Sequence, residues 1–535
     1  MLFRAVEQLK NYFALRKDLA AALAKPLRPE DCPDIIQEEL AGRETAFVDL
    51  LERAVYANSR SPYLKLLHDA AINLDDIRAA VRRDGLESTL SMLRDAGVYL
   101  SFDEYKGRKP IERNGRTYEI AAADMHMPGA GATHHLYTGG STGPAMRVAQ
   151  TLSHQAEQAV YTGLIIHLWL PQNAKVALWR SEPPIPSLNA LVRFTLAGRP
   201  PAAWFTPIPP PKERPSWRSR ALLGTLRRSF QRRGISMPQP EYVPLFEAHR
   251  IAEWIAAEKH RGFTSMVQCN VSSAVRVCAA ATSRGIDIAG ARFFMISEPL
   301  TEAKRRDIEA ARAVPISVYS AVDAGRLAIP CMKPTAADDM HVCKDAVALI
   351  PRRRLHPGND AAIDSFLITT VSRSSPLFLL NVEFDDFGVL ESRDCGCPLA
   401  GLGLDLHVSR VRSFAKLTAE GTTISSDSLT AVIEEALPRR FGGTSIDYQL
   451  LEEDVGSATR LTLVVSPRVG AVEERAVIEE FLRAVRTLRP LGQASRLWED
   501  SSTLRVVRAE PILTPRGKLM PVRVLRDYDR AALPG

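Results

Sequence analysis

The sequence predicts an α/β protein with a large N-terminal domain and a smaller α+β domain at its C-terminal end. Its 535 residues are too many for one ordinary hydrophobic core, so at least two domains are expected. Between residues 241 and 330, apolar runs typical of strands alternate with helical patterns. This alternation favours a sheet that binds its ligands at the carboxyl ends of the strands. Residues 412–535 carry strand-like runs between helical ones, which is typical of a small α+β domain.

We expect residues 1–100 to form a helical region that packs on the large domain, which would span residues 101–411. Apolar residues recur at three- and four-residue spacing over residues 46–56, and a further helix is expected from Leu74. The small domain would occupy residues 412–535.

Residues 182–240 differ in composition, because proline pairs alternate with a basic stretch that contains interleaved apolar residues. The simpler interpretation is a solvated insertion in the large domain. The alternative is an amphipathic helix that docks on an acidic carrier protein or on a membrane surface.

Further elements are expected along the chain from local patterns. A Ser-Glu-Pro-Leu-Thr-Glu segment, residues 297–302, should open a helix with an N-cap hydroxyl and early acids. The other expected helices are 153–168, 429–437 and 473–488, and the expected strands are 176–179, 267–270, 291–296, 444–452 and 461–465.

Composition and charge narrow the class of protein. Hydrophobic residues make up 45% and charged residues 24% of the chain, as in ordinary globular proteins. A net charge of +7 permits an anionic ligand but does not require a nucleic acid. Seven cysteines in so long a chain do not form a disulfide framework, which favours a cytoplasmic location. No uncharged apolar run is long enough to predict a membrane span.

A glycine- and hydroxyl-rich stretch, residues 135–144, is the first candidate site. Glycines let the backbone approach an anion closely, and successive N–H groups with nearby hydroxyls form an anion cradle. It is not a Walker loop, since no Gly-Lys-Ser/Thr follows, and a plain surface loop is the alternative. The candidate phosphate-binding residues are Thr138, Gly139, Gly140, Ser141, Thr142 and Gly143.

This loop resembles the Thr-Ser-Gly-Ser-Thr-Gly loop that holds ATP phosphates in acyl-adenylate-forming ligases. Ser297-Glu298-Pro299 is similar to the Gly-Ala-Glu-Pro segment of phenylacetate–CoA ligase-like enzymes. The chain therefore resembles the adenylate-forming superfamily, in its phenylacetate–CoA ligase-like or capsule-biosynthesis adenylyltransferase-like branch. The resemblance implies that Ser297, Glu298 and Pro299 line an adenine pocket.

Tyr319-Ser320-Ala-Val-Asp323-Ala-Gly resembles the family's Tyr-Gly-Xaa-Thr-Glu-Xaa-Gly. The resemblance implies that Tyr319 stacks on adenine beside Ser320 and that Asp323 helps to hold Mg²⁺. Flat rings suit stacking, and a hard cation needs carboxylate oxygen. Aspartate is one methylene shorter than the family's glutamate, so Asp323 would reach the metal through water.

Three later residues complete the implied nucleotide site. Asp386 falls where the family has an aspartate that accepts the ribose hydroxyls, with Asp385 as its competitor and a surface turn as the alternative. Arg412 matches the hinge between domains, although Phe414 and Ala415 replace the hinge aspartates. Lys518, in Pro-Ile-Leu-Thr-Pro-Arg-Gly-Lys, resembles the lysine that reaches the α-phosphate, where an ammonium stabilises charge in the transition state.

A set of cysteines and a histidine predicts a metal site. The zinc-containing branch of the family carries similar spacing, and the resemblance implies a structural Zn²⁺. Cys343 could substitute for one ligand, and ordinary free thiols are the alternative. The candidate ligands are Cys331, His341, Cys395 and Cys397.

The resemblance implies ATP-dependent activation of a carboxylic acid to an acyl-AMP with release of pyrophosphate. Lys518 and Asp323 would be the catalytic residues, and coenzyme A or an acyl carrier protein would accept the acyl group. Two other readings stay open: an amine or hydroxyl acceptor in specialised biosynthesis, and a degenerate nucleotide-binding scaffold without turnover.

Overall fold

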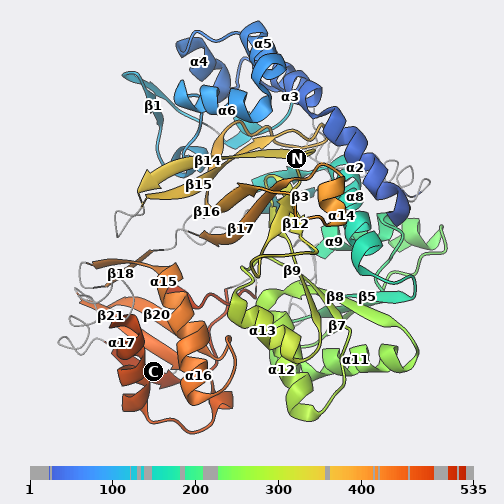
Figure 1. Cartoon of the computed structure of the whole chain (residues 1–535), viewed down its shortest axis with the longest axis vertical. Coiled ribbons are helices and arrows are strands. Elements are labelled where there is room, and N and C mark those ends of the chain that lie inside the picture. Colours follow the sequence, from blue (N-terminus) through green and yellow to red (C-terminus); the bar gives the residue numbers. More distant parts are fainter. Residues whose placement is uncertain are drawn as a thin grey trace, which may run out of the picture.

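The protein has a mixed α/β architecture with one parallel sheet, one large antiparallel sheet and a small C-terminal sheet (Figure 1). This confirms the predicted fold class. The computed structural model describes residues 27–120, 122–128, 134–137, 147–180, 187–208, 227–355, 362–413, 416–419, 422–455, 458–486, 504–514 and 517–525, with Leu23 and Gly224.

The described part of the N-terminal region is helical up to Tyr105, as predicted. Asn73 caps α5 by accepting hydrogen bonds from the backbone N–H groups of Asp75 and Asp76, which explains why this helix begins at Leu74. The elements are η1 (Pro29–Asp31), α2 (Cys32–Ala41), α3 (Arg43–Leu51), η2 (Glu52–Tyr56), α4 (Pro62–Asp69), α5 (Leu74–Asp84), α6 (Leu86–Asp95) and α7 (Phe102–Tyr105).

A six-stranded sheet of parallel strands forms the middle of the chain, in the order β10-β9-β8-β5-β6-β7. Its central strands are buried on both faces, which accounts for their continuous apolar runs. The strands are β5 (Ala174–Trp179), β6 (Ala203–Thr206), β7 (Pro240–Tyr242), β8 (Thr264–Asn270), β9 (Arg292–Ile296) and β10 (Val314–Ser317). The helices between and before them are α8 (Leu152–Trp169), α9 (Ser187–Leu196), α11 (His249–His260), α12 (Val271–Arg284) and α13 (Glu302–Ala310), with η4 (Leu245–Glu247).

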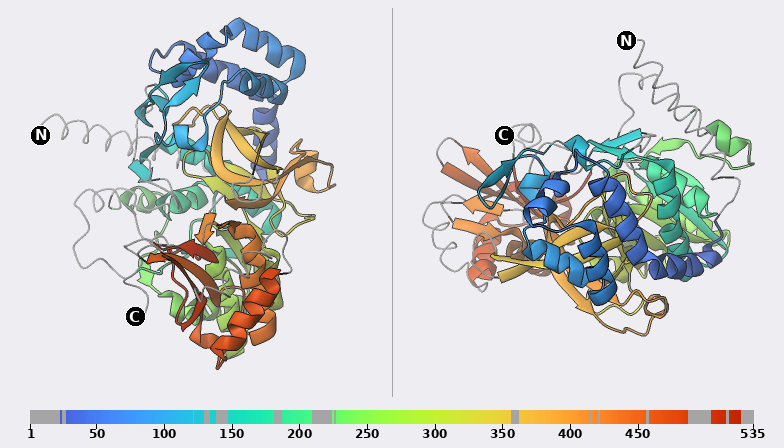
Figure 2. Two further views of the ribbon diagram at one scale, coloured as in Figure 1. Left: turned by 90° about the vertical axis from the view of Figure 1, so that its left-hand side faces the viewer. Right: turned by 90° about the horizontal axis from the view of Figure 1, so that it is seen from above.

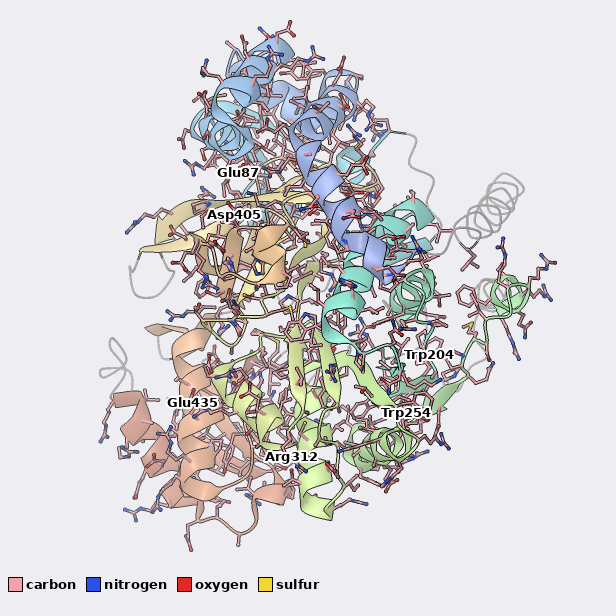
Figure 3. The ribbon with its side chains drawn as sticks, turned by 45° about the vertical axis from the view of Figure 1, so that its right-hand side comes forward. Glu87, Trp204, Trp254, Arg312, Asp405 and Glu435 are labelled. Atoms are coloured by element: carbon pink, nitrogen blue, oxygen red, sulfur yellow. The ribbon has the colours of Figure 1, made fainter. Side chains whose placement is uncertain are left out.

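Residues 187–206 do not form the solvated insertion that the sequence predicts. They form α9 and β6, and β6 pairs with β5 inside the parallel sheet. Trp204 of β6 is 2% exposed and donates its indole N–H to the Arg180 carbonyl, while Trp254 lies on α11 (Figure 3). The prolines that flank this stretch suggested an exposed segment, but the residues between them form a helix and a strand of the core. Residues 209–223 lie outside the described part of the chain.

The seven-stranded sheet is antiparallel throughout, with the order β11-β12-β13-β17-β16-β15-β14. It lies between the N-terminal helices and the parallel sheet (Figure 1). The strands are β11 (Tyr319–Ala321), β12 (Gly325–Pro330), β13 (Met340–Val342), β14 (Val347–Leu355), β15 (Ala362–Thr370), β16 (Val382–Ser392) and β17 (Leu406–Ser413). Beside it stand β1 (Ile111–Arg113), β2 (Arg116–Tyr118), η3 (Ala122–Met125), β3 (His134–Tyr137), β4 (Arg147–Gln150) and α14 (Pro398–Gly401).

The C-terminal part has its own apolar core between helices and a four-stranded sheet ordered β22-β21-β20-β23. Leu450, Leu463 and Phe481 are each fully buried in this core. The elements are β18 (Lys416–Ala419), β19 (Thr422–Ser425), α15 (Ser426–Ala431), η5 (Val432–Ala436), α16 (Leu437–Phe441), β20 (Tyr448–Val455), β21 (Ala458–Val465), η6 (Pro467–Val469), α17 (Glu474–Arg486), β22 (Leu504–Arg508) and β23 (Val522–Val524).

Buried polar contacts hold the C-terminal part against α13. The Lys304 ammonium lies 2.8 Å from the Glu434 carboxylate, and both side chains are 1% exposed. Thr301 also donates its hydroxyl to Glu434, and Ser445 donates to Asp307 at 2.6 Å. The two parts meet along this face (Figures 1 and 2).

Two local expectations need correction or limits. The N-cap hydroxyl of α13 belongs to Thr301, which accepts from the Lys304 N–H at 3.4 Å, while Ser297 has a φ of 76° and lies outside the helix. The domain boundaries stay predictions, although β17 continues to Ser413 as part of the large antiparallel sheet. Among the described residues, no helix is both long and apolar enough to cross a bilayer.

Candidate functional site

Polar residues gather where the parallel strands end. Arg180 follows β5, Asn270 ends β8 and Glu298 lies just after β9. Since the strands are parallel, their carboxyl ends share one edge, where ligands of such sheets commonly bind. The Arg180 guanidinium donates to the Asn270 amide oxygen at 3.4 Å. Burial lowers the pKa of Arg180 to about 10, so this cation lacks most of its hydration.

Tyr319 and Asp386 meet at the same place. Tyr319 begins β11, directly after β10, and its hydroxyl donates to an Asp386 carboxylate oxygen at 2.7 Å. Burial raises the pKa of Tyr319 well above its usual value, and the neighbouring Asp386 raises it further. Burial also raises the pKa of Asp386, against the opposing effects of the Tyr319 hydrogen bond and the Lys518 charge. The structure therefore brings Tyr319, Asp386 and Lys518 together.

Asp323 lies next to this group but is already engaged. Its Oδ2 accepts from the Tyr105 hydroxyl at 2.7 Å and from the Lys106 ammonium at 3.4 Å. Its charge also raises the pKa of both Tyr319 and Asp386. A lysine on the carboxylate opposes direct binding of a second cation, so Asp323 fits a direct Mg²⁺ site poorly.

Lys518 is carried by a turn that docks on the edge of the parallel sheet. The Thr514 N–H donates to the Lys518 carbonyl at 2.9 Å, and the Lys518 N–H donates to the Thr514 hydroxyl at 3.1 Å. Gly517 has a φ of 74°, which favours glycine, and its carbonyl accepts from the Asn270 amide at 3.0 Å. The turn is thus held in a fixed position over the large domain.

The buried Glu298 side chain also holds this turn in place. Its carboxylate accepts from the Leu519 N–H at 2.8 Å and from the Ser272 N–H and hydroxyl at 2.6 and 2.9 Å. The side chain is buried, whereas Ser297 and Pro299 are exposed, as is Ser320. Glu298 therefore positions the C-terminal turn, and Ser297, Pro299 and Ser320 are the members of the predicted adenine-binding segments that solvent reaches.

The predicted phosphate loop, residues 138–143, lies outside the described residues. The strands that flank it are described: Tyr137 of β3 pairs with Arg147 of β4, so the loop joins two antiparallel strands. β4 stands between the loop and α8, so the helix does not begin at the end of the loop. The amide of Gln150, which ends β4, donates to the Val322 carbonyl at 3.4 Å, next to Asp323.

Arg412 lies on β17 opposite Phe387, the residue after Asp386. Its guanidinium donates to Asp338 at 3.0 Å. The same carboxylate accepts from the backbone N–H groups of Arg410 and Val411, so this ion pair fixes the end of β17. The replaced hinge residues, 414 and 415, lie outside the described residues.

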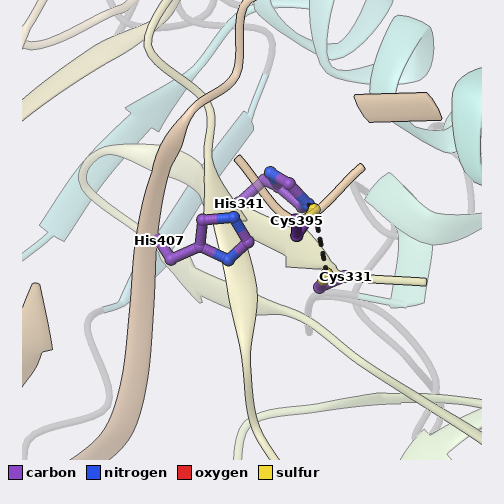
Figure 4. A group of neighbouring side chains, drawn as sticks. All are labelled: Cys331, His341, Cys395 and His407. Carbon is purple, nitrogen blue, oxygen red and sulfur yellow. Dashed lines mark hydrogen bonds between the residues drawn. The ribbon is translucent and has the colours of Figure 1, made fainter. Parts of the chain in front are cut away.

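The predicted metal ligands also come together, and Figure 4 shows three of them, Cys331, His341 and Cys395. The Cys331 and Cys395 sulfurs are 3.7 Å apart. The Nε2 atom of His341 lies 3.6 Å from the Cys395 sulfur and 3.2 Å from the Cys397 sulfur. Ligands of tetrahedral Zn²⁺, with bonds of about 2.3 Å to sulfur and about 2.0 Å to nitrogen, lie roughly 3.5–3.8 Å apart. The arrangement fits such an ion.

The protonation of His341 and Cys397 agrees with a metal site, whereas burial raises the pKa of Cys331 to about 12, so this thiol would lose its proton only on binding the ion. The His341 Nδ1 atom lies 2.5 Å from the Leu404 carbonyl oxygen, so Nδ1 carries the proton. The unprotonated Nε2 atom then has its electron pair for a metal. Burial lowers the pKa of His341 to about 4, so its imidazole is neutral. Burial opposes ionisation of Cys397, but the backbone N–H groups at the start of α14 outweigh it and lower its pKa. A neutral imidazole and a thiolate are the forms that bind zinc.

His407 is a further donor that sequence reasoning missed. Potential ligand atoms of Cys331, His341, Cys395 and His407 all lie within 4.8 Å of one another. The His407 ring is 4.0 Å from that of His341, and its Nε2 is buried without a hydrogen-bond partner among the described residues. Cys343 is not part of this group and instead lies near Asp345 and Arg326, so the idea that it replaces a ligand is wrong.

No model of a known protein family matches the chain, and no curated protein does. Among solved structures, a 2-hydroxyisobutyryl-CoA ligase in complex with 2-HIB-AMP and CoA is 14% identical, with a TM-score of 0.46, over 93% of this chain and 91% of that one. An acyl acid amido synthetase is 9% identical, with a TM-score of 0.48, over 95% of both chains.

Acetoacetyl-CoA synthetase from Streptomyces lividans is 14% identical, with a TM-score of 0.43, over 90% of this chain and 76% of that one. These solved structures are adenylate-forming enzymes. At such low identities and TM-scores the likenesses carry no argument about activity, which must come from the site itself.

Proposed function

We propose that the protein activates a carboxylic acid with ATP and then transfers the acyl group to a thiol, either coenzyme A or an acyl carrier protein. The convergence of Tyr319, Asp386 and Lys518 supports this most strongly. These residues are far apart in the sequence, and the adenylate-forming motifs assign them to the adenine, the ribose and the α-phosphate. One bound nucleotide needs all of these contacts within a single site.

In the first step a carboxylate oxygen of the acid attacks the α-phosphorus of ATP. The bond from that phosphorus to the bridging oxygen breaks, and pyrophosphate leaves with the electron pair. The Lys518 ammonium stabilises the charge that gathers on the phosphate oxygens. One Asp386 carboxylate oxygen accepts from the Tyr319 hydroxyl, and the other would accept from a ribose hydroxyl.

In the second step the acceptor sulfur attacks the acyl carbon, and AMP leaves with the electrons of the acyl–oxygen bond. Mg²⁺ would enter with the ATP phosphates, and Asp323, with Oδ2 engaged by Tyr105 and Lys106, would reach it only through a water molecule. Thr138, Ser141 and Thr142 would hold the phosphates. The phenylacetate–CoA ligase-like branch and a cytoplasmic location are parts of the same proposal.

We also propose that Cys331, His341, Cys395 and Cys397 hold a structural Zn²⁺. The sulfur and nitrogen distances support this, as does the hydrogen bond from His341 to Leu404. The ion would tie the strand that follows Cys331 to the start of α14, at a distance from the reacting groups. It would supply folding energy and no chemistry to the reaction.

Pyrophosphate–ATP exchange over a panel of carboxylic acids tests the activation step. Removal of one positioned charge commonly costs roughly 10²–10³ in rate, so Lys518→Ala should lose that much exchange. Arg460, a partly exposed cation of the same part of the chain, provides the control Arg460→Ala. The proposal would be refuted if none of the acids supported pyrophosphate exchange, or if the two variants exchanged pyrophosphate equally well.

Hydroxylamine trapping separates activation from transfer, because it captures the acyl-AMP without a natural acceptor. Addition of coenzyme A, of a carrier protein or of an amine then identifies the acceptor. Hydroxamate formation, together with transfer of the acyl group from the acyl-AMP to an amine but not to a thiol, would retain the adenylation and overturn the thiol acceptor.

A further inference from the structure

A buried arginine and a half-buried one lie beside one face of α8, outside the nucleotide site. Arg326 of β12 is 2% exposed, and its Nε and Nη1 atoms find no hydrogen-bond partner among the described residues. Its backbone N–H donates to the Gln158 side chain at 2.7 Å. Gly325, with a φ of 78°, allows this approach, since a Cβ there would lie 2.9 Å from Gln158. Gly325 therefore lets the backbone of Arg326 lie directly against α8.

Arg193 of α9 faces the same helix. Its Nε donates to the Gln155 side chain at 2.8 Å, one turn before Gln158 on α8. Burial, together with the Arg326 charge, lowers the pKa of Arg193 to about 9. Burial likewise lowers the pKa of Arg326 to about 10, and no carboxylate opposes this. Two neighbouring guanidinium groups thus lie among amides, aromatic rings and the Cys343 thiol, and within the described residues neither forms an ion pair with a carboxylate.

Such an arrangement destabilises the ligand-free protein. Buried charges are normally paired, because the loss of hydration costs several kcal/mol per ion. The guanidinium of Arg326 lies 5.3 Å from the Phe294 ring centroid, and this ring in turn contacts Phe194 of α9. The surroundings are therefore apolar rings and amides, which recognise a ligand well but do not neutralise a cation.

A chain of amides connects the arginines with the nucleotide site. The Gln155 amide donates to the Gln150 side chain at 3.0 Å, and the Gln150 amide donates to the Val322 carbonyl at 3.4 Å. Val322 precedes Asp323 in the segment that also carries Tyr319. A ligand held at Arg193 and Arg326 would therefore extend from the region where the acid is activated.

We propose that Arg193 and Arg326 bind a second carboxylate of the acid substrate, so that the protein activates a dicarboxylic acid. This inference rests on the proposed adenylation. Guanidinium groups prefer carboxylates, and the unpaired N–H groups of Arg326 supply donors for that anion. One carboxylate would then offset one of the two positive charges, shared between the two guanidinium groups, while the other faces ATP.

The test compares diacids with monoacids of equal length: succinate with butyrate, glutarate with pentanoate and adipate with hexanoate. The variants are Arg326→Met and Arg193→Met, with Arg284→Met, an exposed arginine in the last turn of α12, as the control. Thermal shifts without ATP report binding, and pyrophosphate exchange reports activation.

At least one diacid should raise the Tm of the unaltered protein, whereas its monoacid partner should not. Arg326→Met should abolish that shift, and it should raise the Tm of the ligand-free protein by removing an unpaired buried charge. In exchange it should lower kcat/KM for the diacid by roughly 10–100-fold and spare the monoacid, as expected for a lost charged hydrogen bond. Arg284→Met should change neither.

Equal shifts with diacids, monoacids and inorganic phosphate, or a diacid preference that survives in both variants, would overturn the proposal. If Arg326→Met does not fold, Arg193→Met and Arg326→Lys give the same test, since lysine should retain the diacid preference. If a diacid raises the Tm of the unaltered protein but not that of Arg326→Met, while no acid supports pyrophosphate exchange, that result would retain the anion site and refute the adenylation.

Discussion

The buried ion pair between Lys304 and Glu434 gives the sharpest stability prediction. Its charges are 2.8 Å apart, and both side chains are 1% exposed. With an effective dielectric constant of about 20, the attraction at this distance is roughly 6 kcal/mol, offset by the loss of hydration. Lys304→Met leaves the Glu434 carboxylate buried without its cation, and such changes typically destabilise by about 3–5 kcal/mol.

The adjacent pair provides a matched control. Arg306 and Glu435 lie 3.1 Å apart, each one or two residues from the buried pair, but their side chains are 55% and 34% exposed. An exposed pair of this kind contributes about 0–1 kcal/mol. Arg306→Ala should therefore change the free energy of unfolding by less than about 1 kcal/mol.

Urea unfolding at pH 7 gives these differences from the shift in midpoint at constant m. The double variant Lys304→Met with Glu434→Leu should recover most of the loss, since it removes both charges together. Equal effects of Lys304→Met and Arg306→Ala would refute the reasoning, because the C-terminal part would then not bury Glu434 against α13 in solution.

The remaining predictions concern the site and its surroundings. Tyr319→Phe removes the hydrogen bond to Asp386, and it should raise KM for ATP several-fold in the exchange assay while adenine stacking remains. Cys395→Ser should reduce bound zinc, measured by elemental analysis, and lower the Tm; unchanged zinc would contradict the assigned ligands. Burial raises the pKa of Asp345 to about 6, so its stabilising effect is complete below pH 4 and lost as the pH rises through 6. Asp345→Asn, which can still accept from Tyr161, should therefore gain stability over the unaltered protein by up to about 3 kcal/mol at pH 8 and none at pH 3.5 in urea titrations.

Local patterns predicted the elements that depend on local residues. The strand expected over 291–296 is β9, and the helix expected over 153–168 is α8, each within about one residue of its bounds. The helix expected over 473–488 is α17. These segments combine a clear apolar period with recognisable ends, and so they can be read without tertiary information.

The stretch from 187 to 206 shows where local reading fails. Its composition, with prolines on both sides, suggested a solvated insertion, but its apolar residues pack inside the parallel sheet. Strand pairing is decided by partners elsewhere in the chain, which composition does not describe. The length of the large domain without this strand was the only available signal.

Within the site, motif order predicted that Tyr319, Asp386 and Lys518 belong together, and the structure places them together. The contacts of Asp323 could not be predicted, because Tyr105 and Lys106 lie 218 and 217 residues away in sequence. The role of Glu298 as the anchor for the C-terminal turn was also missed, since its motif suggested a ligand contact.

A crystal structure with bound ATP tests the central claim most directly. We expect the adenine ring against Tyr319, the ribose hydroxyls at Asp386 and the innermost phosphate within hydrogen-bond reach of Lys518. A nucleotide that binds elsewhere, or one that contacts Tyr319 while its α-phosphate lies beyond the reach of Lys518, would contradict the account.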